Sequence, residues 1–181
     1  MNTMQEDLEK AVAYHGHLCS GQILGVRMAR IACKYLGIDN PVLSKRLIVF
    51  VESDRCIADA IGTVTGCKIG KRTLKWKNFG KTAATFVDLK ENKAIRLHSI
   101  FHEFPDKDDD IIDFYSGLAD EELFALEEVV VDLKKGELPG PPSEVKICEN
   151  CGEEVLDGCH VVKDNKILCR YCAGDRYYKL K

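Results

Sequence analysis

The sequence lacks several features that would place it in a simple class of protein. None of its apolar runs approaches the roughly 18 residues that a membrane-spanning helix needs, and residues 1–7 are polar and acidic, unlike a secretory signal. The formal net charge of -3 and the isoelectric point near 6.0 argue against a nucleic-acid binder that works by bulk charge. We therefore expect a cytoplasmic protein without membrane association, and nucleic acid is not an expected partner.

Cysteine, in contrast, is abundant, because nine of the 181 residues carry a thiol. With no signal peptide and an odd count, these thiols predict metal ligands or reduced side chains rather than a disulfide framework. A chain of this length can form one good core and a small appendage.

The densest group of reactive side chains lies at residues 15–21 (HGHLCSG), where two imidazoles and a thiol fall within five positions. An apolar helical pattern follows directly, with Ser20 as its predicted N-cap. The unpaired N–H groups of a helix N-terminus favour a thiolate over a thiol. His17 and Cys19, two residues apart, are therefore candidate ligands of one metal ion. The alternative is a packed N-cap loop with a buried cysteine.

A second reactive segment follows a buried-strand pattern. The apolar run at residues 47–51 predicts a strand with both faces covered, and residues 54–64 predict a helix. Cys56 falls in the first turn of that helix, the same setting as Cys19. The sequence therefore predicts that these two thiols, far apart along the chain, meet at one site.

Two further side chains belong to this expected site. Asp59 lies three residues after Cys56 and on the same helix face, where its carboxylate is expected to orient a ligand or move a proton; the alternative is a solvent-facing carboxylate. Cys67 is a candidate fourth ligand that would close the site. It lies in residues 65–71 (TGCKIGK), a glycine-rich turn that has the ingredients of an anion-binding loop but lacks the spacing of a nucleotide P-loop.

The rest of the core mixes strand and helix patterns. Residues 76–79 and 82–87 flank Gly80 and predict a β-hairpin. Further strands are predicted at residues 94–98 and 126–133; for the second, continuation of the preceding helix is the alternative. Helices are predicted at residues 4–14, where Thr3 and Glu6 match a capping box, and at residues 120–124. The pattern as a whole predicts an α+β fold.

Glycine and proline are concentrated in residues 135–146, which predicts a linker between a core domain at residues 1–134 and a small module at residues 147–181. The module carries two C-x2-C pairs with seventeen residues between them, a spacing typical of a four-thiolate zinc site. The four cysteines are Cys148, Cys151, Cys169 and Cys172.

This module is too short to bury a core of its own. A structural zinc ion is therefore expected to supply much of its folding free energy, on the order of 10 kcal/mol. We expect a zinc-ribbon or treble-clef shape, and iron in a rubredoxin-like site is the alternative.

These separated motifs resemble the E-subunit family of tungsten/molybdenum formylmethanofuran dehydrogenase. The family pattern H-G-H-x-C-P-G is matched at residues 15–21, except that Ser20 replaces the proline. The patterns C-x-x-D-A-I and T-G-C-x-x-G-K are matched at residues 56–61 and 65–71, with Gly62 where the family often has glutamine. Some members carry a C-terminal zinc ribbon, so the resemblance covers nearly the whole chain.

The resemblance implies an α+β core that dimerises, a metal-capable cleft and a cytoplasmic setting. The enzyme that gives the family its name reduces CO2 onto methanofuran with a pterin-bound metal held by its other subunits. Nothing in this sequence resembles a molybdopterin-binding domain or a ferredoxin cluster motif. The implied partners are therefore a second copy of the chain and, in some members, the subunits of a molybdenum or tungsten oxidoreductase.

From these residues we predict a metalloprotein with two sites. The core site would hold zinc or another divalent transition metal through His17, Cys19 and Cys56, with a position left for water or a carbonyl group. His15 and Asp59 are the candidate catalytic side chains, beside the ligands. A role in one-carbon metabolism is implied only by the resemblance.

Two alternatives of a different class stay open. One is a non-enzymatic accessory subunit that docks through the C-terminal module. The other is a redox or metal sensor in which Cys56 and Cys67 form a reversible disulfide.

Overall fold

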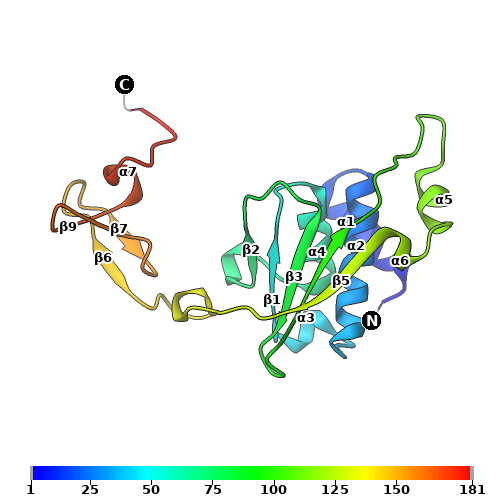
Figure 1. Ribbon diagram of the computed structural model, residues 1–181, viewed down its shortest axis with the longest axis horizontal. Coiled ribbons are helices and arrows are strands. Elements are labelled where there is room, and N and C mark those ends of the chain that lie inside the picture. Colours follow the sequence, from blue (N-terminus) through cyan, green and yellow to red (C-terminus); the bar gives the residue numbers. More distant parts are fainter. Residues whose placement is uncertain (1, 180–181) are drawn as a thin grey trace. The chain divides into compact units, whose positions relative to one another are not determined.

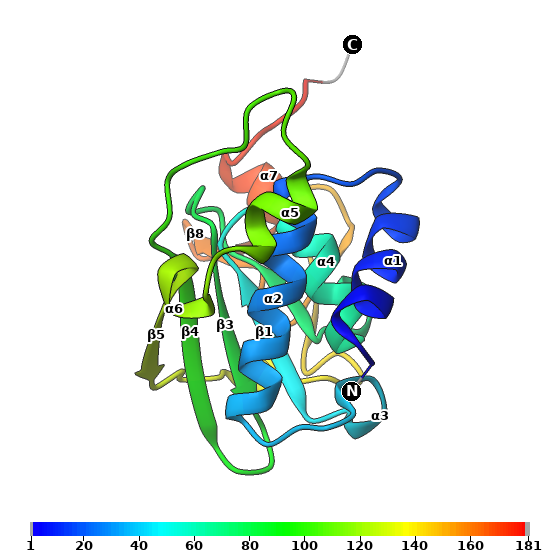
Figure 2. The same ribbon diagram turned by 90° about the vertical axis from the view of Figure 1, so that its right-hand side faces the viewer.

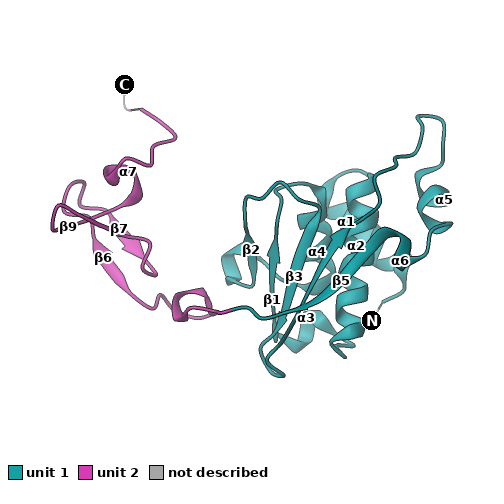
Figure 3. Cartoon of the chain, in the orientation of Figure 1, with its two compact units in different colours: residues 1–131 teal, residues 132–181 magenta. Residues whose placement is uncertain are grey.

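A computed structural model describes residues 2–179 of the chain (Figure 1). The chain divides into two compact units, Met1–Val131 and Asp132–Lys181 (Figure 3). Within the described residues, no helix is both long enough and apolar enough to cross a bilayer. The mixed helix-and-sheet class predicted from the sequence is confirmed.

The first unit contains helices and the strands of one sheet. Its elements in chain order are α1 (Met4–His15), α2 (Ser20–Tyr35), α3 (Pro41–Ser44), β1 (Leu47–Val51), α4 (Cys56–Thr65), η1 (Ile69–Lys71), β2 (Leu74–Trp76), β3 (Ala83–Asp88), β4 (Lys93–Ser99), α5 (Ile111–Ser116), α6 (Asp120–Leu123) and β5 (Phe124–Val129).

The sheet has the strand order β2-β1-β3-β4-β5, in which only the β1–β2 pair is parallel. Helices α1, α2 and α4 lie on one face of this sheet (Figure 2). The inward side chains of β1, among them Leu47, Val49 and Val51, pack with Ile57 and Ile61 of α4 in a single buried cluster. The core therefore lies between the sheet and the helix layer, and β1 runs through its middle.

The predicted hairpin around Gly80 is wrong. Gly80 does form a turn, with φ +66°, but β2 pairs in parallel with β1 and β3 pairs with the opposite edge of β1. The loop between them passes over the end of β1, where the backbone N–H groups of Phe79 and Lys81 donate to the carbonyl oxygen of Glu52, each at 3.2 Å. The glycine signal predicts a turn, but it does not tell which strands pair. Because β1 lies between β2 and β3 in the sheet, each of these two strands pairs with β1 and not with the other.

Most of the other elements follow their local signals. The predicted strands at 94–98 and 126–133 are confirmed as β4 and β5, although β5 begins and ends earlier than expected. The expected N-cap of α2 is displaced by one residue, because Cys19 and not Ser20 holds the extended N-cap conformation. This displacement puts a candidate metal ligand at the helix N-terminus.

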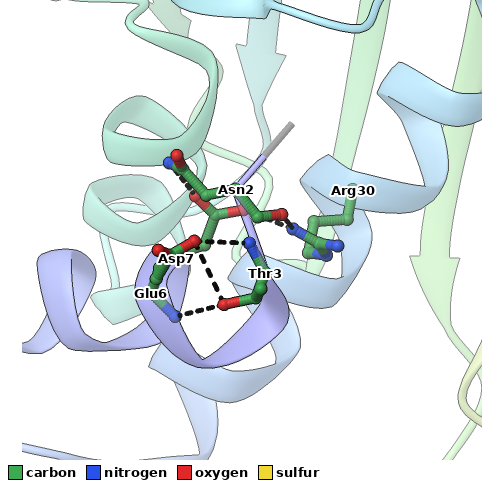
Figure 4. A network of polar contacts seen from close by, with 5 residues as sticks. All are labelled: Asn2, Thr3, Glu6, Asp7 and Arg30. Carbon is green, nitrogen blue, oxygen red and sulfur yellow. Dashed lines mark hydrogen bonds and ion pairs between the residues drawn. The ribbon is translucent and has the colours of Figure 1, made fainter.

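A polar network at the start of the chain joins α1 to α2 (Figure 4). Thr3 and Glu6 form the predicted capping box. The buried carboxylate of Asp7 accepts from Nη1 of Arg30 at 2.5 Å, and the same nitrogen donates to the carbonyl oxygen of Asn2 at 2.7 Å. A buried charge needs such a partner, so this network fixes α1 against α2 and with it the position of His15 at the end of α1.

Helices α2 and α4 approach each other unusually closely. A Cβ atom added to Gly21 would lie 2.8 Å from the Cβ of Cys56, and one added to Gly25 would lie 2.7 Å from the Cβ of Ala60. Glycine in a helix costs about 1 kcal/mol relative to alanine. The two glycines let the helix backbones touch and bring the N-terminal ends of α2 and α4 together.

The second unit is built from short elements. They are η2 (Lys135–Glu137), β6 (Val145–Ile147), β7 (Glu154–Leu156), β8 (Val161–Lys163), β9 (Lys166–Leu168) and α7 (Arg170–Ala173). β6 pairs with β7 and β8 pairs with β9 as two antiparallel hairpins. Asp164 and Asn165 form the β8–β9 turn with φ values of 51° and 59°, the left-handed conformation that a two-residue hairpin turn requires.

The close helix contact yields a stability prediction. Gly25→Val is expected to lower the free energy of unfolding by about 1–3 kcal/mol, because its side chain would overlap Ala60 and the carbonyl oxygen of Ile57. Urea denaturation followed by circular dichroism measures the change. Gly70→Val is the matched control, since an added Cβ there meets no atom within 4 Å. Equal stability of the two variants would contradict the packing argument.

A second prediction concerns acid stability. The buried carboxylate of Glu52 accepts from Nε and Nη2 of Arg96 at 2.7 and 3.0 Å, and these hydrogen bonds hold the pKa of Glu52 below its ordinary value although burial acts in the opposite direction. Because the folded pKa is the lower one, the contribution of this carboxylate to stability is complete above the unfolded pKa of about 4.3 and is lost as the pH falls through the folded pKa.

The difference in unfolding free energy between the natural protein and Glu52→Gln should therefore shrink as the pH falls from about 6 to about 3. Urea titrations at each pH measure it. A difference that stayed constant over this range would show that Glu52 does not titrate with folding.

Candidate metal centres

The His15–Cys19 segment is a sharp connection between α1 and α2. His15 is the last residue of α1, and Gly16 ends the helix with φ +98°, a left-handed conformation that favours glycine. The chain then turns through His17 to Cys19, the N-cap of α2. The left-handed conformation of Gly16 therefore reverses the chain direction between α1 and α2, so that His15, His17 and Cys19 all lie in this short connection.

These three side chains converge in space. Each of His15, His17 and Cys19 offers one ligand atom, and the three atoms lie within 4.8 Å of one another. The two imidazole rings lie 4.7 Å apart between centroids, at an angle of 41°. Two imidazoles and a thiol at this separation form a donor set that suits zinc and similar divalent ions.

His15 is oriented by a residue from another helix. Its Nδ1 lies 2.8 Å from the Oδ2 of Asp59 on α4. If Nδ1 carries the proton and donates to Asp59, Nε2 keeps a lone pair, and Nε2 is a buried atom without a hydrogen-bond partner among the described residues. A carboxylate on one ring nitrogen and an open lone pair on the other is the arrangement of a metal-ligating histidine.

The sequence analysis placed His15 beside the ligands as a candidate catalytic side chain, whereas its ligand atom lies within 4.8 Å of those of His17 and Cys19. The spacing H-x-H-x-C carries no sign of which histidine faces Asp59, because that contact joins α1 to α4. Asp59, which the helix spacing placed on the same face as Cys56, contacts Nδ1 of His15.

Cys56 lies beside this group. It is the first residue of α4, and its thiol lies near enough to Cys19 to affect the pKa of that thiol. Its sulfur is not, however, among the ligand atoms of the group that lie within 4.8 Å of one another. Burial raises the pKa of Cys19, and the neighbouring Cys56 thiol raises it further. The helix N-terminus alone therefore does not make Cys19 a thiolate, and a bound cation would supply the missing favourable charge.

Gln22 is a buried residue of this region that the sequence patterns did not single out. It lies in the first turn of α2, is fully buried, and donates from Nε2 to the carbonyl oxygen of Cys56 at 2.7 Å, whereas its Oε1 has no partner among the described residues. Its only sequence signal is a polar side chain on an otherwise apolar helix face. Gln22 thus links the helix turn of Cys19 to that of Cys56.

Cys67 does not join the group. It follows the C-terminal end of α4 and is buried, and its Sγ lies 3.6 Å from the carbonyl oxygen of Leu47. Helix α4 has ten residues, of which Cys56 is the first, so its length of roughly 13 Å separates Cys56 from the segment of Cys67. A disulfide needs Cα atoms within about 7 Å, so the alternative of a reversible Cys56–Cys67 disulfide does not fit this fold.

The second group of ligand atoms lies in the C-terminal unit. The thiols of Cys148, Cys151, Cys169 and Cys172 all lie within 4.8 Å of one another, and Cys148 is buried. Backbone N–H groups of Cys169 and Cys151 lower the pKa of Cys148 to about 6, so this thiol is readily ionised near neutral pH. Four converging sulfurs can supply all four ligands of a tetrahedral metal ion and leave no position for water, which is typical of a structural metal site.

The two cysteine pairs come from different local structures. Cys148 and Cys151 lie in the turn between β6 and β7, where the N–H of Gly152 donates to the carbonyl oxygen of Cys148 at 2.9 Å. Cys169 is the N-cap of α7, and its Sγ accepts from the N–H of Cys172 at 3.4 Å. Each tight turn directs its two sulfurs to one side, and the two turns face each other.

Comparison with known proteins is consistent with this architecture. Residues 14–126 match a family model described as FmdE, molybdenum formylmethanofuran dehydrogenase operon. A probable S-adenosyl-L-methionine-binding protein of Archaeoglobus fulgidus is 28% identical in an alignment 201 positions long. The alignment covers 94% of this chain and 53% of that protein. The chain therefore spans about half the length of this curated relative.

A similar solved structure is the crystal structure of an FmdE-like protein of the tungsten formylmethanofuran dehydrogenase type from Syntrophus aciditrophicus. The TM-score is 0.62 at 23% sequence identity, and the match covers 98% of this chain and 96% of that chain. At this identity the likeness shows a shared fold.

Proposed function

Because the chain belongs to the FmdE family, we propose that it is a metalloprotein whose core site binds a divalent transition ion, with zinc as the first candidate. Membership also confirms the resemblance drawn from the motifs. The proposed ligands are Nε2 of His15, one ring nitrogen of His17 and the sulfur of Cys19, with the Cys56 thiol as a further donor beside them.

One observation carries this proposal. The Nε2 atom of His15 is buried and has no hydrogen-bond partner among the described residues, while Asp59 occupies the other ring nitrogen. A buried polar atom without a partner costs about 1–3 kcal/mol. A cation bound by Nε2, together with the nearby donors of His17 and Cys19, would remove that cost.

The number of protein ligands decides what the site can do. With three ligands, a bound zinc ion supplies a position that polarises a carbonyl group or activates water. With Cys56 as a fourth ligand, the site is closed and structural. In both cases Asp59 holds the tautomer of His15, and its side chain, 45% exposed, can exchange a proton with solvent.

If the core site has three protein ligands, the protein would be an enzyme that acts on a small carbonyl or one-carbon substrate. The name of the family supports this substrate class. The chain would then act in one-carbon metabolism, as an oxidoreductase-associated protein. A second copy of the chain and the subunits of a molybdenum or tungsten oxidoreductase are the proposed partners, in a cytoplasmic setting.

A second candidate function is that of a non-enzymatic accessory protein in such a complex. The C-terminal unit favours it, because this unit is compact by itself and carries its own thiol cluster. A metal-stabilised unit of this kind is suited to docking, and zinc is its proposed ion. The core site would then have a structural role.

Counting metal ions tests the core site. The purified natural protein is expected to contain two ions per chain, of which Cys19→Ser removes the core ion and Cys148→Ser the C-terminal ion. Inductively coupled plasma mass spectrometry measures both. Cys159→Ser is the control, because this exposed cysteine belongs to neither group of ligand atoms. A single ion that is insensitive to Cys19→Ser would contradict the proposal.

The role of Asp59 gives a separate prediction. Asp59→Asn is expected to weaken core metal binding about 10- to 100-fold, because the amide no longer holds His15 as the carboxylate does. Competition with a chromogenic chelator measures the affinity. Asp54→Asn removes an exposed carboxylate five residues earlier and is expected to leave the affinity unchanged. If both variants bind equally, Asp59 does not orient a ligand.

A further inference from the structure

A large cavity lies along helix α2 within the first unit. Its volume is about 1180 Å³, compared with roughly 300–1,000 Å³ for typical small-molecule sites. Helix α2 forms the floor, with α1 on one side of it and α5 and α6 on the other (Figure 2). The α2 residues that line the cavity extend from Ile23 to Lys34, a rise of roughly 17 Å, so the cavity is elongated along this helix.

Apolar stripes of three helices form the walls of the cavity. Met4, Leu8 and Val12 follow one another at intervals of four residues and therefore lie on one face of α1. Ile31 lines the cavity from α2, and Ile112 lines it from α5. Single exposed apolar side chains are ordinary on a protein surface. Apolar side chains from three helices around one hollow are instead typical of a binding site.

The charged side chains on the floor are already paired. Nε of Arg27 donates to Oδ1 of Asp120 at 2.8 Å, and its other two nitrogens donate to backbone carbonyl oxygens of the α5–α6 segment at 2.7 and 2.8 Å. Arg30 is held by the buried carboxylate of Asp7, as described above. A carboxylate thus balances the positive charge of each guanidinium group, and the floor presents no net charge to a ligand.

The other charged side chains that line the cavity are exposed and lie at its rim. Three are acidic and one is basic: Glu9, Asp39, Glu121 and Lys34. Solvent screens exposed charges of this kind, and their acidic excess disfavours an anion. A cation that entered the cavity would lose its hydration without gaining an unpaired carboxylate on the floor. The part of a ligand that fills the interior is therefore expected to be uncharged.

We propose that this cavity binds the apolar chain or ring system of an uncharged small molecule. The volume, the apolar walls and the paired charges of the floor all suit such a ligand. This inference goes beyond the proposed function, because it concerns a binding site that contains none of the proposed metal ligands.

One end of the cavity adjoins the core site. Leu18 lines the cavity and lies between His17 and Cys19 in the chain, whereas these two proposed ligands do not line it. Consecutive Cα atoms are 3.8 Å apart. A molecule in the cavity would therefore lie next to the donors of the proposed core site without displacing them.

Another polypeptide fits this surface less well. A surface that meets a second protein presents exposed apolar side chains at its centre. Among the apolar side chains that line this cavity, only Ile112 is largely exposed, at 44%, whereas the others are partly or fully buried. The apolar atoms are thus recessed between the helices, where a narrow chain can reach them.

Displacement of a dye tests the proposal. N-phenyl-1-naphthylamine, an uncharged dye whose emission rises in an apolar site, is titrated into the full-length, metal-loaded protein. Straight-chain alcohols from butanol to decanol are then added as competitors. We expect the affinity to rise about fourfold for each added methylene group, because each one leaves water. At pH 7 decanoate should bind more weakly than decanol, because its charge has no free partner on the floor.

Two variants locate the binding site. Leu8→Glu is expected to weaken the binding of decanol about tenfold, because it places a charge on the apolar wall. Val12→Trp changes the same wall without adding a charge, and it should weaken binding by filling part of the cavity. Leu43→Glu is the matched control, since this leucine of α3 is 71% exposed and does not line the cavity. Circular dichroism verifies that all variants are folded.

The assay is repeated with Cys19→Ser, which lacks a proposed ligand of the core ion. This variant should bind decanol like the natural protein, since Cys19 does not line the cavity. The metal count and the dye assay therefore fail or succeed independently, and a wrong assignment of the core site would not be mistaken for an empty cavity.

Several results would overturn the proposal. The first is an absence of displacement, or an affinity that does not rise with chain length. The second is unchanged binding by both Leu8→Glu and Val12→Trp, which would locate the dye elsewhere. The third is a dimer in size-exclusion chromatography with light scattering that Leu8→Glu dissociates, without binding of the alcohols, which would identify a second copy as the occupant. The fourth is displacement of the dye by an amphipathic leucine–lysine helical peptide but not by decanol, which would identify a protein partner.

Discussion

The contact between α2 and α4 is the constraint on which both the core and the candidate metal site depend. Gly21 and Gly25 leave no side chain between the two helix backbones, so Cys56 and Ala60 lie directly against α2. The cost of glycine within a helix is offset by this burial. The same contact places the N-terminal ends of the two helices side by side, so that Cys56 of α4 lies near Cys19 at the start of α2.

Polar side chains then fix what the close contact has brought together. Asp59 holds His15, and Gln22 holds the first turn of α4, while Arg30 anchors the start of α1 through Asp7. Buried or partly buried polar groups of this kind favour one arrangement, because an alternative arrangement would leave a donor or acceptor without a partner. Two buried atoms of this region, Nε2 of His15 and Oε1 of Gln22, have no partner among the described residues. His15 belongs to the same group of potential ligand residues as His17 and Cys19, and this supports the proposed cation site.

The two units of the chain achieve stability by different means. The first buries a continuous cluster of apolar side chains between sheet and helices. The second has short hairpins and few buried residues, and its thiols converge on one point. A metal ion in such a unit substitutes for a hydrophobic core. One chain thus combines a candidate metal site positioned by a hydrophobic core with a small unit in which four thiols converge.

Local patterns in the sequence were sufficient for features that depend on neighbouring residues. They determined the helix of α1 with its capping box, the buried strand β1, the two C-x2-C pairs and the family, because propensity, burial and ligand spacing all act over short distances along the chain. Only the tertiary structure decided that β2 pairs with β1, that His15 faces Asp59, and that the Cys67 thiol packs beside the carbonyl oxygen of Leu47. These outcomes depend on which segments pack together in the core. They arise from contacts between residues that are far apart in the sequence, and a local sequence pattern carries no information about such contacts.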